Sequence, residues 1–94
     1  MKINKIIITP RFIAHTPQNF KMQKARKFYE QYGILKEKIL IDKQTKTLID
    51  GYTSYLLAKE LGLKRVHVVK LKNNKAYSTI KGLLMQINKN LKEE

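Results

Sequence analysis

The residue types best suited to chemistry lie together in Asp50-Gly51-Tyr52-Thr53-Ser54, where a short apolar run meets a helical pattern. Gly51 permits a tight strand-to-helix turn and a close approach to the backbone. The first amides of a helix have no intrahelical partner, so such a turn favours anions, phosphate above all. The hydroxyls of Thr53 and Ser54 could add hydrogen bonds to phosphate oxygens. Asp50 is the predicted N-cap of the helix.

The spacing of apolar residues predicts the elements that position this turn. Strands are expected at about residues 3–8, 38–41, 47–49 and 65–71, with the second and third joined as a hairpin. Helices are expected over residues 20–32, 50–61 and 78–91, and Gly33 and Gly62 stand where the first two end. Residues 9–19 form a connection in which Pro10 and Pro17 prevent regular pairing. The order strand, helix, hairpin, helix, strand, helix predicts one α+β domain over residues 1–94, with a small mixed sheet and a core at about 3–71.

The last predicted helix carries an apolar stripe at helical spacing, formed by Ile80, Leu83, Leu84, Ile87 and Leu91. Such a stripe is most often explained by packing on the chain's own sheet, and we favour that interpretation. The alternative is pairing with a second copy of the chain, which would make a homodimer through this helix. Tyr52 and Tyr55 are likewise expected to pack rather than to stack on bases.

The charge balance is the strongest feature of the composition. Twenty Lys and Arg residues face seven Asp and Glu residues, which gives a net charge of +13. Such a field attracts polyanions such as nucleic acid, although a lysine-rich proteome would also explain it. Most of these residues are Lys, a diffuse point charge, whereas Arg is preferred for bidentate readout. The residues expected to contact nucleic-acid phosphates are Arg11, Lys21, Lys24, Lys27, Lys64 and Arg65.

Composition also argues against several other classes. The chain has no cysteine, so a disulfide framework and a cysteine-rich zinc site are excluded. His15 and His67 have no neighbours at ligand spacing, and we expect no metal site. The acidic residues are scattered among lysines without the pairing typical of general acid and base catalysis. No apolar run reaches transmembrane length and no signal peptide is recognisable, so we expect a soluble cytoplasmic protein without a membrane partner.

The run from Thr47 to Val69, which contains Leu48-Ile49-Asp50-Gly51 and the helical pattern after it, resembles the centre of the ParB/sulfiredoxin-like domain. The stretch from Phe28 to Asp42 is similar to that family's helix, glycine and following strand. The resemblance covers roughly residues 3–71 and depends on the hydrophobic spacing and the glycines. It implies a ParB/sulfiredoxin-like fold and nucleotide-phosphate binding at the turn before the helix that begins at Gly51. Several members of the family also act on DNA, as partition proteins or nuclease-like domains.

The turn itself departs from the family's signatures. Partition proteins have Gly-Glu-Arg-Arg and sulfiredoxins have Gly-Cys-His-Arg, where this chain has Gly51-Tyr52-Thr53-Ser54. Sulfinic acid reduction is excluded, since no thiol exists to form the sulfur intermediate. Nucleotide hydrolysis is not expected, because the acidic residue and the arginines are missing. In the resembled fold the Thr16-Pro17 connection lies near this turn, and the helix that follows it carries Lys21 and Lys24. The expected nucleotide-binding residues are therefore Gly51, Tyr52, Thr53, Ser54, Lys21 and Lys24.

Three functional classes follow from these observations. We favour a non-catalytic nucleic-acid-binding module, for DNA rather than RNA, with a nucleotide as an additional ligand and no required cofactor. One alternative is a nucleotide-binding domain with weak NTPase or nuclease activity. The other is a non-catalytic protein-interaction module that meets its partner through the last helix.

Overall fold

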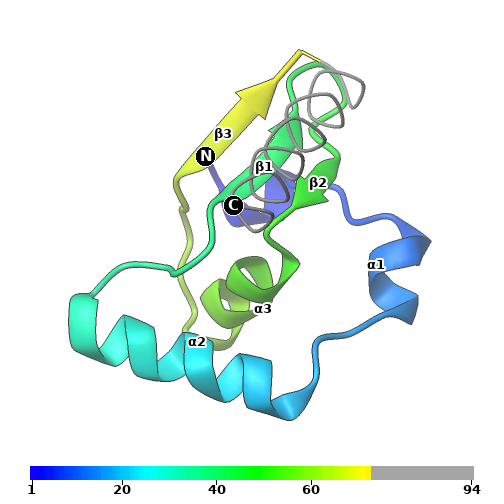
Figure 1. Ribbon diagram of the computed structural model, residues 1–94. Coiled ribbons are helices and arrows are strands. Elements are labelled where there is room, and N and C mark those ends of the chain that lie inside the picture. Colours follow the sequence, from blue (N-terminus) through cyan, green and yellow to red (C-terminus); the bar gives the residue numbers. More distant parts are fainter. Residues whose placement is uncertain (73–94) are drawn as a thin grey trace, which may run out of the picture.

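The computed structural model describes residues 1–72, which form a small sheet packed against helices (Figure 1). In chain order the elements are the 3-10 helix η1 (Ile3–Lys5), α1 (Pro10–Ala14), α2 (Asn19–Tyr32), β1 (Ile39–Asp42), β2 (Leu48–Asp50), α3 (Tyr52–Glu60) and β3 (Val68–Leu71). The strand order is β2-β1-β3, with β1 antiparallel to β2 and parallel to β3. The predicted α+β class with a small mixed sheet is confirmed. The helix predicted at 78–91, with its pairing to a second copy, lies outside the described residues.

β1 is the central strand and supplies much of the apolar face of the sheet. Ile39 and Ile41 are 1% and 0% exposed, whereas Leu40 and Asp42 are half-buried. This alternation is what a strand with one fully covered face requires. The strand itself follows from a run of apolar, mostly β-branched residues, and its predicted pairing with the strand at 47–49 is confirmed.

The hairpin between β1 and β2 is closed by local hydrogen bonds. Asp42 Oδ1 accepts hydrogen bonds from the amides of Gln44 (2.8 Å) and Thr45 (3.0 Å). These bonds, the one from Thr45 first, lower the pKa of the Asp42 carboxyl. Lys46 ends the turn with a φ of 64°, and within residues 1–72 no other non-glycine residue has a positive φ. Its Nζ donates to the carbonyl oxygen of Lys43 (2.7 Å).

α3 lies between α2 and the sheet and supplies much of the core (Figure 1). Tyr55, Leu57 and Ala58 are buried, because they recur at helical spacing on the covered side of the helix. The helix ends in a Schellman arrangement, in which the amide of Leu63 donates to the carbonyl oxygen of Ala58 (3.0 Å) and Gly62 has a φ of 73°. The predicted helix and its glycine end are confirmed.

The strand predicted at residues 3–8 is wrong. Ile3–Lys5 forms η1, and isolated bridges join Lys2 to Arg65 and Ile7 to Thr47. Ile3 and Ile6 are both buried, while Ile7 is 53% exposed. Two core residues three positions apart face the same way in a helical turn, whereas a strand would place them on opposite faces. The β-branched composition predicted a strand, but the three-residue spacing of the buried Ile3 and Ile6 fits a helical turn.

Two expectations near the turn also need correction. The connection at 9–19 contains α1, which begins with Pro10 at its first position, where the missing amide proton costs nothing. The N-cap position of α3 is Gly51, with a φ of 87°, and no side chain caps the helix there. Asp50 is the last residue of β2 and pairs with Leu40, so it precedes the N-cap position that the sequence assigned to it. Instead its Oδ1 accepts a hydrogen bond from the amide of Gly51 (2.8 Å).

Candidate functional site

A hollow of about 620 Å³ lies at the N-terminal end of α3, and we term it the α1–α3 hollow. Its walls come from α1, the connection to α2, the first turns of α2 and α3, and the residues flanking the central strand. It is lined by Arg11, Phe12, His15, Thr16, Pro17, Gln18, Lys21, Glu37, Asp50, Tyr52 and Thr53. The turn predicted to bind phosphate therefore opens into a cavity, and two of the predicted basic residues, Arg11 and Lys21, line it.

Aromatic packing holds α1 over the start of α3. The rings of Phe12 and Tyr52 lie with their centroids 5.2 Å apart and tilted by 46°, and Tyr52 in turn stacks on Tyr55 at 6.1 Å. Such ring pairs add to the free energy gained by burying the side chains. Because Arg11 precedes Phe12, this contact also fixes the backbone that carries the guanidinium. Tyr52 packs, as expected, and does not present its ring as an isolated stacking platform.

A smaller hollow of about 190 Å³ lies on the α2 side of the same turn, and we term it the α2–α3 hollow. It is lined by Phe20, Lys21, Lys24, Ala25, Lys36, Glu37, Thr53 and Ser54. Lys21, Glu37 and Thr53 line both hollows, so these residues stand between them. The family resemblance implied that Lys21 and Lys24 lie near the turn, and both line this hollow beside it.

Two of the predicted ligand residues have structural roles. Gly51 is buried, and a Cβ added there would clash with the carbonyl oxygen of Lys38 and lie 2.9 Å from the Cα of Ile39. Ser54 is 1% exposed, and its Oγ accepts a hydrogen bond from the amide of Glu37 (3.1 Å). The serine hydroxyl therefore ties the segment before β1 to α3. Thr53, which is half-buried and lines both hollows, is the hydroxyl within reach of a ligand.

The α1–α3 hollow is of mixed charge. Glu37 and Asp50 line it together with the cationic Arg11 and Lys21. These two carboxylates are far apart in the sequence and gave no pattern there. The fold brings their segments together. The Asp50 carboxylate also accepts a hydrogen bond from the amide of Gly51, which is one of the donors expected to bind a phosphate. A bare anion therefore meets both attraction and repulsion here.

An exposed ion pair joins the two helices beside these hollows. Arg26 of α2 donates from Nε and from one terminal nitrogen to the two carboxylate oxygens of Glu60, both at 2.6 Å. This bidentate arrangement, through the hydrogen bonds from Arg26, lowers the pKa of the Glu60 carboxyl. Arg26 is thus engaged within the chain, which leaves the lysines of α2 as its basic groups for a ligand.

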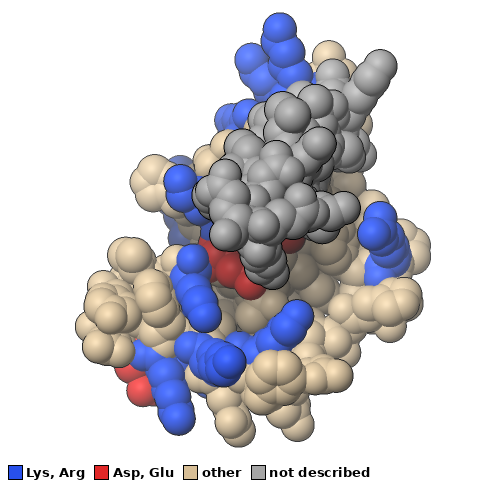
Figure 2. Space-filling model, in the orientation of Figure 1, with Lys and Arg blue, Asp and Glu red and all other residues tan. Residues whose placement is uncertain are grey.

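The six residues expected to contact nucleic acid do not form a single cluster. Arg11, Lys21 and Lys24 gather at the start of α3. Arg65 lines a different hollow, beside β3, and Lys64 is its exposed neighbour in the chain. Lys27 is an exposed residue of α2. Figure 2 shows that basic side chains are spread over this face, whereas acidic side chains occur in few places.

Sequence reasoning missed several basic residues that line the hollows. Lys36 and His15 join the residues around the start of α3, and Lys5, Lys46 and Lys70 line the hollow that contains Arg65. Local patterns give no signal for them, because His15 is an isolated histidine and each of the others is one of many lysines in the chain. Within residues 1–72, no group of three or more His, Asp or Glu residues lies close enough to hold a metal ion. In the same region, no helix has the length and apolar character needed to span a membrane.

Comparison with known proteins supports the fold. No protein-family model matches the chain, and no curated protein matches it. A solved structure of a Pnob8-like ParB-N domain is similar to it, with a TM-score of 0.65 and 25% sequence identity. The match covers 86% of this chain and 32% of that chain, so this chain spans about a third of the length of the structure it matches. The chain therefore has a ParB-N-like fold, as the resemblance in its sequence implied.

Proposed function

We propose that this chain is a nucleic-acid-binding, ParB-like module that contacts phosphates through the basic side chains at the start of α3. The observation that carries the proposal is the gathering of Arg11, Lys21, Lys24 and Lys36 from three separate segments around one turn. The net charge of +13 adds a long-range attraction for a polyanion. Lysine predominates, so binding is expected to depend on phosphates and to be largely indifferent to base sequence.

Salt dependence of duplex DNA binding tests this proposal. If these four basic residues each contact one phosphate, they should contribute about −3.6 to the slope of log K against log salt. Lys21→Gln and Lys24→Gln should each make that slope shallower by about 0.9, because each removes one phosphate contact. Lys59→Gln is the matched control, since Lys59 is an exposed lysine of α3 that lines none of the hollows described here. Undetectable or salt-independent binding of DNA and RNA at low ionic strength would favour the protein-interaction alternative.

A second candidate function, nucleotide binding without turnover, is favoured by the α1–α3 hollow. Its volume of about 620 Å³ is within the range typical of small-molecule sites, and Thr53, Arg11 and Lys21 line it. Glu37 and Asp50 would repel a bare triphosphate, and Mg²⁺ could bridge carboxylates and phosphates. We therefore expect a nucleotide to bind there more tightly with Mg²⁺ than without it.

The test is titration of the chain with CTP, ATP and GTP, with and without Mg²⁺, followed by amide chemical shifts. Perturbations should centre on residues 50–55 and on the first turns of α1 and α2. Shift changes elsewhere, or none at millimolar ligand, would mean that the turn is only structural. A turnover rate that is lost in Thr53→Ala would instead support the enzymatic alternative, because Thr53 carries the hydroxyl within reach of a ligand.

A further inference from the structure

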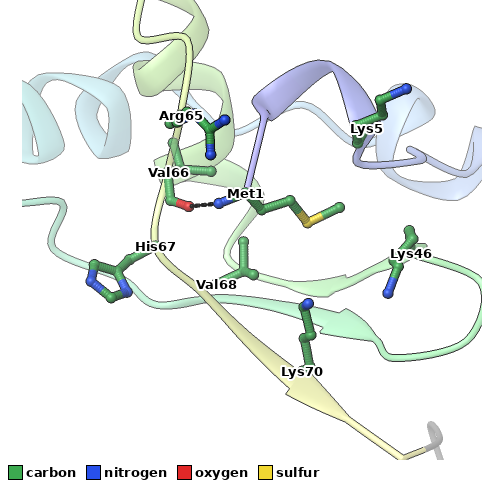
Figure 3. Close-up of a pocket in the computed structure, with 8 residues that line it drawn as sticks. All are labelled: Met1, Lys5, Lys46, Arg65, Val66, His67, Val68 and Lys70. Carbon is green, nitrogen blue, oxygen red and sulfur yellow. Dashed lines mark hydrogen bonds between the residues drawn. The ribbon is translucent and has the colours of Figure 1, made fainter.

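A separate hollow of about 790 Å³ lies beside β3, and we term it the β3 hollow (Figure 3). It is lined by Met1, Lys5, Lys46, Arg65, Val66, His67, Val68 and Lys70. Its four cationic residues come from four different segments: η1, the hairpin turn, the connection after α3, and β3. None of the lining residues within residues 1–72 is acidic, in contrast to the α1–α3 hollow with its two carboxylates.

We propose that the β3 hollow binds a phosphate of a nucleic-acid backbone and forms a second contact region, distinct from the start of α3. This inference rests on the proposed nucleic-acid-binding function and assigns it three residues that sequence patterns did not indicate: Lys5, Lys46 and Lys70. Arg65, which was expected to contact nucleic acid, belongs to this hollow.

Most of the charge around the β3 hollow is uncompensated in the part of the chain that the structure describes. Lys46 is the exception, because it donates to the carbonyl oxygen of Lys43 (2.7 Å) and its charge helps to lower the pKa of the Asp42 carboxyl. The ion pair found within residues 1–72 joins Arg26 to Glu60, and none of the four cations of the hollow takes part in one. Lys5, Arg65 and Lys70 are exposed, and Lys46 is half-buried. Like charges that share one hollow repel each other, and a bound phosphate reverses that repulsion. Binding of these cations to a nucleic-acid backbone is favourable, because it releases the counterions condensed on the phosphates.

Backbone hydrogen bonds fix the segments that carry these cations. The amide of Val66 donates to the carbonyl oxygen of Met1 (2.9 Å), and the amino group of Met1 donates back to the carbonyl oxygen of Val66 (3.1 Å; Figure 3). The amide of Ile7 donates to the carbonyl oxygen of Lys46 (2.9 Å). In Figure 3 the side chain of Lys70 rises from β3 toward Met1. The backbone that carries the cluster is therefore in place before a ligand binds, which lowers the entropic cost of binding.

The shape of the hollow favours a phosphate backbone over an anionic membrane. Val66 is buried and Val68 is half-buried, so the apolar residues form the floor, below the cationic side chains. A surface that binds a bilayer instead projects apolar side chains into the lipid, with basic residues on the polar face. The phosphates of a duplex project from its surface, so they can reach cations that line a recess. Binding of the same cluster to anionic vesicles is thus an outcome that the experiment must distinguish.

Neutralising substitutions test the inference. Lys46→Gln, Lys70→Gln and the double variant are compared with wild type and with Lys59→Gln, by titration of a short DNA duplex between about 50 and 200 mM salt. Each single substitution should make the slope of log K against log salt shallower by about 0.9, and the double variant by about 1.8. Lys70→Arg should restore the wild-type slope, because it keeps the charge. Thermal melts of every variant show whether a loss of binding reflects a loss of folding.

Two results would overturn the inference in different ways. If wild type binds DNA and the double variant has the same slope as Lys59→Gln, the β3 hollow makes no phosphate contact, while the proposed function at the start of α3 stands. If wild type binds no nucleic acid, both proposals fail. Retained DNA binding by the double variant, together with loss of binding to vesicles of anionic lipid, would assign the hollow to a membrane surface and also overturn the inference.

Discussion

Replacing Gly51 by alanine tests whether the turn between β2 and α3 depends on close contact with the central strand. Gly51 has a φ of 87°, a left-handed conformation that L side chains rarely adopt. A Cβ at this position would also clash with the carbonyl oxygen of Lys38 and lie 2.9 Å from the Cα of Ile39. Both are backbone atoms at the start of β1, so no side-chain rotation can relieve the clash. Two separate costs therefore apply at this one position.

The magnitude follows from adding those costs. A non-glycine residue in the left-handed region loses about 1–2 kcal/mol. Overpacking against atoms that cannot move aside adds about 1–3 kcal/mol. The total of about 2–5 kcal/mol is a large part of the about 5–15 kcal/mol by which a domain is stable. Gly33→Ala is the matched control, because Gly33 has a φ of 71° and nothing lies within 4 Å of an added Cβ. It should lose only the left-handed cost.

The assay is urea unfolding of both variants and wild type, followed by circular dichroism. Gly51→Ala should lower the free energy of unfolding by about 1–3 kcal/mol more than Gly33→Ala does. If Gly51→Ala does not fold and Gly33→Ala does, the result would also support the prediction, because it would show the larger loss of stability at Gly51. Equal losses in the two variants would refute the argument, because they would show that the backbone of β1 can yield and that only the φ angle requires glycine.

Three further predictions concern the surroundings of the hollows. Ser54→Ala should lower the free energy of unfolding in urea by about 1–3 kcal/mol, since the amide of Glu37 loses its acceptor. Lys46→Gly should raise the thermal midpoint, by relief of up to about 1 kcal/mol of left-handed strain, and yet weaken DNA binding. The pKa of the Asp42 carboxyl is lowered in the folded chain, so its stabilisation is complete above the unfolded value of about 3.9 and is lost as pH falls through the folded pKa. Thermal melts from pH 6 to 2 should therefore show a smaller decline for Asp42→Asn than for wild type, and equal declines would contradict this assignment.

The sequence by itself determined the elements that depend on short-range patterns. The spacing of apolar residues predicted α2, α3 and the hairpin of β1 and β2, because helical and alternating periods are set by nearest neighbours along the chain. Gly33 and Gly62 marked the ends of two helices, since only glycine takes the left-handed conformation without strain. The family resemblance depended on the same two signals, and the fold that it implied is confirmed.

Tertiary structure alone decided how these elements meet and what each polar group does. The segment at Ile3 and Ile6 had the composition of a strand, and its contacts with the core made it a helical turn. Asp50 could have capped α3, but its pairing in β2 moved that position to Gly51. Glu37 and Asp50 line the same hollow, and four cationic residues from separate segments lie together beside β3. These arrangements depend on contacts between residues far apart in the chain, and no local period or spacing encodes such contacts.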